Sequence, residues 1–128
     1  MLVQVPVSWG EMLDKITILE IKSEQIKDAG KLMNIRRELE ELCRTRDELI
    51  VMPDEVKAMV AELKHINQKL WVVEDDLRDC ERKKDFGAKF VELARAVYYT
   101  NDERAAVKRE INDALGSALV EEKSYAAY

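Results

Sequence analysis

Residues Val5–Lys22 have the sequence VPVSWGEMLDKITILEIK. It is apolar and rich in β-branched residues, so its composition suits a strand as well as a helix. Ser8 resolves the choice, because a Ser that is followed three residues later by Glu11 forms the capping box that begins a helix. We therefore expect a helix over residues 8–28.

This first helix carries apolar side chains on more than one face. One stripe contains Met12, Ile16, Leu19 and Ile26, and a second contains Leu13, Ile18 and Ile21. A helix that is apolar around much of its circumference is normally surrounded by other elements. We therefore expect residues 8–28 to lie at the centre of the fold.

Residues 1–7 precede this helix and alternate in the manner of a β-strand, with Val3, Val5 and Val7 on one side. The pattern predicts a short N-terminal strand, the only strand in the chain. A lone strand leaves its backbone N–H and C=O groups unpaired. It must therefore pair with the C-terminal tail, pair with a second copy of the chain, or remain in water.

The rest of the chain predicts four more helices. Their most regular pattern runs from Val56 to Cys80, where apolar residues recur at alternating intervals of three and four. The predicted helices cover residues 31–51, 53–84, 86–99 and 101–117, and residues 118–128 form a tail. Short connections make consecutive helices antiparallel neighbours. The sequence thus predicts one all-α domain over residues 1–128, an antiparallel bundle in which the second and third helices form a long central hairpin and the last two cover its far end.

The composition argues against two classes of function, nucleic-acid binding and membrane insertion. The net charge of −5 argues against binding to a nucleic-acid backbone, which requires clustered Lys and Arg. No apolar run approaches the roughly 18 residues of a membrane span, and the N-terminus lacks the basic and apolar regions of an export signal. We therefore expect a cytoplasmic protein that binds neither nucleic acid nor membrane.

Three apolar features suggest a second copy of the chain. They are the unpaired strand, the doubly striped first helix, and the end of the third helix that extends beyond the second. Because two-fold dimers are the commonest assembly, the sequence predicts a homodimer. The expected contact residues are Val3, Val5, Trp9, Ile18 and Ile21. The first interpretation is a noncatalytic homo-oligomeric interaction or scaffold protein, with no catalytic residue and no cofactor.

Acidic side chains support an alternative interpretation, because carboxylates three residues apart share one face of a helix and can hold Mg²⁺. The candidate ligands are Glu38, Glu41, Asp75, Asp76 and Asp79. Such a site would make the chain an enzyme or a binding module for a phosphorylated metabolite or nucleotide. The same acids have basic neighbours, which is typical of a solvated helix surface. Whether the protein is an enzyme stays open.

Aromatic residues near polar ones give a second candidate site. A shallow ligand pocket could be lined by Trp9, Trp71, Tyr98, Tyr99, Asn101 and Arg104. Trp and Tyr in such positions also serve as ordinary packing residues with a polar tip. Both alternatives remain open at this point.

Several blocks of the sequence resemble a known family. They are VPVSWGEMLDKITILEIK, LWVVEDDLR, FVELARAVYYTNDERAAVKREIN and EEKSY, which together extend over nearly the whole chain. They are similar to a family of short bacterial and phage proteins of unknown function. The resemblance implies no established activity and no catalytic residues. It also implies a connection with surface-polysaccharide or glycosyltransferase genes, and hence with surface-polysaccharide metabolism for the alternative function.

Overall fold

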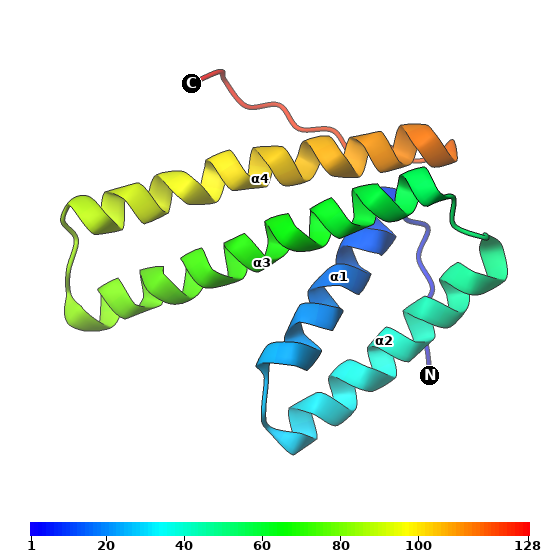
Figure 1. Cartoon of the computed structure of the whole chain (residues 1–128), viewed down its shortest axis with the longest axis horizontal. Coiled ribbons are helices and arrows are strands. Elements are labelled where there is room, and N and C mark those ends of the chain that lie inside the picture. Colours follow the sequence, from blue (N-terminus) through cyan, green and yellow to red (C-terminus); the bar gives the residue numbers. More distant parts are fainter.

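The computed structural model describes all 128 residues, and it contains four helices and no strand (Figure 1). The helices are α1 (Trp9–Gln25), α2 (Ala29–Leu49), α3 (Asp54–Lys83) and α4 (Ala88–Leu115). The prediction of an all-α fold is confirmed. None of the four helices has the length and apolar character needed to cross a membrane.

Helix α1 is the centre of the structure. It begins where the capping box predicts, because the Ser8 Oγ accepts a hydrogen bond of 3.1 Å from the backbone N–H of Glu11. Helix α1 contacts α2, α3 and α4, whereas α2 contacts α1 alone. Most of both apolar stripes is therefore covered within one chain. Leu13, Ile16 and Ile21 are each no more than 1% exposed.

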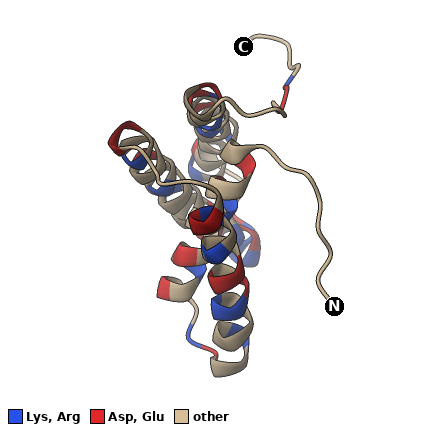
Figure 2. Ribbon diagram, turned by 90° about the vertical axis from the view of Figure 1, so that its right-hand side faces the viewer, with Lys and Arg blue, Asp and Glu red and all other residues tan.

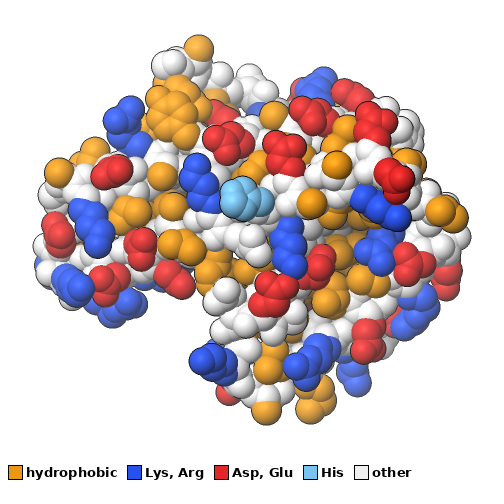
Figure 3. All heavy atoms as spheres, in the orientation of Figure 1, with side chains coloured by type: hydrophobic (Ala, Val, Ile, Leu, Met, Phe, Trp, Pro, Cys, Tyr) orange, Lys and Arg blue, Asp and Glu red, His pale blue; other side chains and the backbone are white.

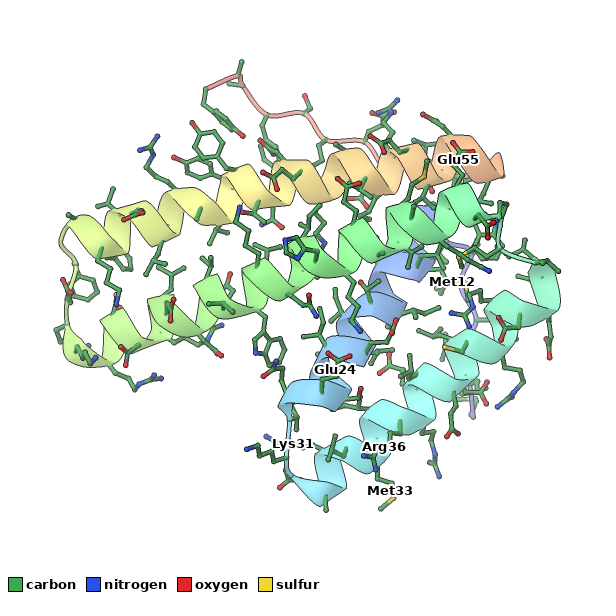
Figure 4. The ribbon with its side chains drawn as sticks, viewed as in Figure 1. Met12, Glu24, Lys31, Met33, Arg36 and Glu55 are labelled. Atoms are coloured by element: carbon green, nitrogen blue, oxygen red, sulfur yellow. The ribbon has the colours of Figure 1, made fainter.

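The long hairpin is formed by α3 and α4, which lie antiparallel along their whole length (Figure 1). The prediction of a hairpin between residues 31–51 and 53–84 is wrong. The two helices diverge from the connection at Pro53, so α2 packs on α1 and α3 packs on α1 and α4. Apolar residues of α2 still reach the core, and these are Ile35, Leu39, Leu42 and Cys43. The outer face of α2 carries Met33 and Arg36, which point away from α1 (Figure 4).

Helix α4 is one continuous helix, so the prediction of separate helices over residues 86–99 and 101–117 is wrong. The capping-box pattern at Thr100 does not interrupt it, because no Gly or Pro stands nearby and the long α3 offers an unbroken partner. Thr100 is 1% exposed in the middle of the helix. The helix ends at Gly116, whose φ of 61° lies in the left-handed region.

Residues 1–7, which we call the arm, form no strand, and this prediction is also wrong. The arm makes no backbone hydrogen bond, because no other segment of the chain is extended beside it. It leaves α1 and runs free of the helices (Figure 2). Leu2, Val3 and Val5 are 70%, 81% and 66% exposed.

Only one of the three apolar features that predicted a homodimer thus remains uncovered. The two stripes of α1 are covered by its three neighbours except at Ile18 and Ile26, which are half-buried. The far end of α3 is covered by α4, and Val73 and Cys80 there are 8% and 3% exposed. The arm is the feature that a single copy leaves in water.

Helices α1 and α4 approach most closely at Gly10. A Cβ atom at this position would lie 2.5 Å from the backbone oxygen of Lys108, which no real contact permits. The backbone N–H of Gly10 donates a hydrogen bond of 2.7 Å to Asn112 Oδ1. The absence of a side chain therefore lets the start of α1 rest directly on the α4 backbone.

Replacing this glycine should separate the two helices. We expect Gly10→Ala to lower the free energy of unfolding by about 1–3 kcal/mol, because the added methyl group must displace backbone rather than a flexible side chain. Urea unfolding followed by circular dichroism measures the change. Gly30→Ala is the control, since its Cβ would meet only the Asp28 carboxylate at 3.4 Å and Ala favours the helix by up to about 1 kcal/mol. Equal effects of the two substitutions would contradict the close approach.

Candidate functional site

An ion pair between a buried carboxylate and a half-buried guanidinium joins α1 to α4. The Asp14 side chain is 2% exposed and accepts two hydrogen bonds from Arg104, one from Nε at 2.9 Å and one from Nη2 at 2.5 Å. This is the bidentate arrangement in which guanidinium and carboxylate groups bind most strongly. The hydrogen bond to Asp14 raises the pKa of Arg104 further above its ordinary value, against the opposing effect of burial. Arg104 is therefore charged.

Helix α3 contributes Asn67 to the same cluster. Its Nδ2 donates to Asp14 Oδ1 at 2.9 Å and to Thr17 Oγ1 at 3.0 Å, while the Thr17 hydroxyl donates to the Asp14 backbone oxygen at 2.7 Å. The Asn67 side-chain oxygen accepts no hydrogen bond from the protein. The three helices that meet here are thus connected by polar groups as well as by apolar packing.

A second cation, Lys108, lies beside this pair. Its Nζ is 4.0 Å from Asp14 Oδ2 and donates to Glu11 at 2.7 Å and to Glu121 of the tail at 2.9 Å. Burial acts to lower the pKa of Lys108, but the hydrogen bonds to the two glutamates and the charge of Asp14 outweigh it, so the pKa is raised. The hydrogen bond from Lys108 lowers the pKa of Glu121. These charges hold the start of the tail against α4.

A groove of about 540 Å³ opens above the Asp14–Arg104 pair, between α1, α3 and α4. Figure 3 shows the surface hollowed between α1 and the far part of α3. Its apolar lining comes from Ile18, Ile21, Leu70 and Trp71, and its polar lining from Asn67, Glu74, Asp75, Arg78, Asn101 and Arg104. We call it the α1–α3–α4 groove.

The polar groups of the groove are only partly used within the protein. Arg78 Nη1 donates to Glu74 Oε2 at 2.7 Å, whereas the exposed Asp75 carboxylate has no partner in the chain. The contact from Arg104 Nη1 to Asn101 Oδ1 is long, at 3.5 Å. The groove therefore offers unused donors and acceptors to a ligand.

Comparison with known proteins places the whole chain in one family. The model of a family of unknown function, DUF6165, matches residues 3–128. The chain belongs to this family. Comparison with curated proteins and with solved structures gives no match. Membership of a family of unknown function agrees with the resemblance found in the sequence.

The structure brings together three of the six residues predicted to line a ligand pocket, namely Trp71, Asn101 and Arg104. Trp9 lies elsewhere, packed against the core, and its backbone N–H donates to Ser117 Oγ at 3.2 Å. Tyr98 and Tyr99 also lie elsewhere. Their rings contact each other and the ring of Tyr128 in the tail, with centroid distances of 4.5–5.4 Å.

The five residues predicted to contact a second copy are likewise divided. Val3 and Val5 are exposed on the arm. Ile18 lines the groove, Trp9 is half-buried against the core, and Ile21 is 1% exposed. A surface that combines all five residues is therefore not present, because α1 uses its second apolar stripe to pack on its own chain.

The acids of the Mg²⁺ alternative are dispersed. Asp75 lines the groove, while Asp79 pairs with Lys83 at 2.8 Å and Glu38 pairs with Lys15 at 3.0 Å. Glu41 pairs with Arg44 at 3.0 Å, and Asp76 is half-buried on α3. Nowhere does the structure gather three or more His, Cys, Asp or Glu side chains in a way that could hold a metal ion.

Sequence reasoning missed Asp14, Asn67 and Lys108, although a signal for Asp14 is present. Asp14 stands four residues before Ile18 and seven before Ile21, in line with the second apolar stripe of α1. A carboxylate within an apolar stripe must find a partner when the stripe is buried. The cation and the amide that meet it come from residues distant in sequence, so their pairing could not be recognised before the helices were placed.

Replacing Arg104 should show how much the ion pair with Asp14 contributes to the free energy of unfolding. We expect Arg104→Met to lower the free energy of unfolding by about 3 kcal/mol, because it leaves the Asp14 carboxylate buried without a hydrogen-bonded cation. Chemical denaturation measures the loss. Arg109→Met is the matched control, since the Arg109–Glu122 pair is exposed and should contribute less than about 1 kcal/mol. If the two substitutions lower the free energy of unfolding equally, the pair between Asp14 and Arg104 does not organise the fold.

Proposed function

We propose that this protein is a noncatalytic binding module that holds a small polar metabolite, of the size of a nucleotide, in the α1–α3–α4 groove. The observation that carries the proposal is the convergence of an arginine, two amides and a tryptophan from α3 and α4 on a groove above a buried charged cluster. Its volume of about 540 Å³ lies in the range of small-molecule sites, which are roughly 300–1,000 Å³.

The cluster below the groove supports this proposal because it prepares the site in advance. Asp14 holds the Arg104 guanidinium by two hydrogen bonds, so the arginine does not need to be ordered when a ligand arrives. Preorganised polar groups improve affinity by reducing the entropy lost on binding. Buried charges cost stability compared with apolar packing, and a ligand-binding role accounts for their presence.

A noncatalytic role is supported by the chemistry of the lining. The groove is lined by no Ser, Thr, Cys, Lys or His side chain that could act as a nucleophile. Glu74 is engaged by Arg78. Asp75 is the only acid of the Mg²⁺ alternative that reaches the groove, so an Mg²⁺-assisted mode would require the ligand to supply further oxygen atoms.

A ligand screen tests the proposal. We expect a nucleotide or nucleotide sugar, supplied with and without Mg²⁺ at a hundred times its Kd, to stabilise the protein by about 2.7 kcal/mol. That gain corresponds to a rise of roughly 10 °C in Tm for a domain of this size. Scanning fluorimetry measures the shift.

Variants in the groove locate the binding. Trp71→Ala should weaken the affinity about 10- to 100-fold, because base stacking on an aromatic side chain contributes about 1–3 kcal/mol. Val72→Ala is the control, since the neighbouring Val72 is 57% exposed and does not line the groove. A screen without any shift, or equal losses in both variants, would contradict binding in the groove.

A second proposal, homo-oligomerisation through the arm, is favoured by a separate observation. The arm has no backbone hydrogen bonds, and its valines alternate with its other side chains. Two copies could therefore pair their arms as strands, which would satisfy backbone groups and cover apolar side chains together. In this mode Val3 and Val5 are the contact residues.

Light scattering on the purified protein tests the second proposal. The full chain should have twice the monomer mass of 14.8 kDa at micromolar concentration, and a chain lacking residues 1–7 should have the mass of one copy. Met33→Asp is the control, because Met33 is 66% exposed on α2 and its replacement should leave the mass unchanged. A full-length monomer would overturn pairing through the arm without affecting the groove.

A further inference from the structure

The floor of the groove contains a polar atom without a partner. Asn67 is 5% exposed, and its Nδ2 makes both of its hydrogen bonds inside the cluster, to Asp14 and Thr17. These contacts fix the orientation of the amide, because turning it over would place its oxygen against the Asp14 carboxylate. Every enclosed side-chain nitrogen and oxygen atom of the protein has a partner. The Asn67 Oδ1, which has none, must therefore face the groove that this residue lines.

An acceptor in this position selects among ligands. A fully ionised phosphate or carboxylate carries acceptors only, so it cannot satisfy the Asn67 oxygen. A hydroxyl or an N–H group can donate to it. Because leaving a buried acceptor unpaired is costly, sites of this kind strongly reject ligands that lack the matching donor.

Arg104 provides the complementary group. Its Nη1 makes only the 3.5 Å contact with Asn101, so it can donate to an oxygen or nitrogen atom of a ligand. The groove as a whole does not favour a polyanion. Arg78 and Arg104 are opposed there by three carboxylates, those of Asp14, Glu74 and Asp75.

Trp71 completes the arrangement with a flat apolar surface. It is half-buried beside Leu70 and Ile18 in the lining. An aromatic ring in such a place packs well against the face of another ring. The polar edge and the flat face of one ligand can thus be recognised together.

We infer that the groove recognises a neutral ring that carries a hydrogen-bond donor beside an acceptor. The ligand's donor binds to Asn67 Oδ1, its acceptor binds to Arg104 Nη1, and the face of its ring packs against Trp71. The inference rests on the proposed function and specifies which part of the ligand enters the groove. Phosphate groups attached to such a ring remain outside, in solvent. Nucleobases and hydroxylated sugar rings share this chemistry.

The test removes the donor from the ligand rather than the acceptor from the protein, because Asn67 also holds Asp14 and its replacement would disturb the fold. The probes are uridine, adenosine and methyl α-glucopyranoside. Their matched controls are N3-methyluridine and N6,N6-dimethyladenosine, in which the N–H donors of the base are blocked, and the fully O-methylated glucoside, in which every hydroxyl donor is blocked. Inorganic phosphate and diphosphate represent the charged groups alone.

Binding is measured by saturation-transfer NMR on the full chain and by fluorescence of Trp9→Phe, in which Trp71 is the only tryptophan. At least one ring probe should bind and change the Trp71 emission, and blocking its donor should weaken binding by about 100-fold or more. Binding of a nucleoside that is lost when its base is methylated identifies a base as the ligand, whereas binding of the glucoside identifies a sugar. Phosphate and diphosphate should neither bind nor compete.

The outcomes separate the inference from the proposed function. If the blocked analogues bind as well as their parents, or if phosphate competes at Trp71, the ring inference is overturned while binding in the groove stands. The same holds if a nucleotide binds in the groove but no ring probe binds. If neither the ring probes, nor nucleotides, nor phosphate bind, both the inference and the proposed function fail.

Discussion

The structure depends on the ion pair between Asp14 and Arg104. The pair joins the buried Asp14 of α1 to the half-buried Arg104 of α4, and through Asn67 it also contacts α3. Separating the pair would leave the Asp14 carboxylate buried without its hydrogen-bonded cation, which is strongly destabilising. The helices that could otherwise slide along apolar stripes are thereby held in one register. The groove lies directly above this pair, so the same contacts that define the fold also define the site.

Close packing complements the polar cluster. Gly10 brings the start of α1 against the α4 backbone about one helical turn before Asp14, and Asn112 receives its N–H. Lys108 then connects α4 to Glu11 on the same turn. The first two turns of α1 are consequently attached to α4 by backbone, amide and charged contacts. This attachment explains why the shortest helix can organise three longer ones.

Local signals in the sequence predicted the helix boundaries that depend on neighbouring residues. The capping box at Ser8 gave the start of α1 correctly, and the three–four spacing gave the extent of α3. Signals that depend on distant partners were less informative. The alternating pattern of the arm did not produce a strand, because the arm has no partner strand. The capping-box pattern at Thr100 did not begin a new helix, because α4 packs along α3 both before and after this residue.

The choice of helix partner and most of the site could not be predicted for the same reason. Apolar spacing shows that a helix has a buried face but does not identify what covers it, and this is why α4 rather than α2 was found along α3. Trp71, Asn101 and Arg104 were recognised by residue type. Their convergence with Asp14 and Asn67 depends on crossing geometry that a sequence does not display.

Helix α2 occupies an unusual position, since it rests on α1 and on no other helix. Among its 21 residues only Ile35 is buried. An element with so few buried contacts opens at lower free energy than the rest of a molecule. None of the groove residues belongs to α2. Local unfolding of α2 should therefore need less free energy than unfolding of α3 or α4, and it would remove no residue from the lining of the groove.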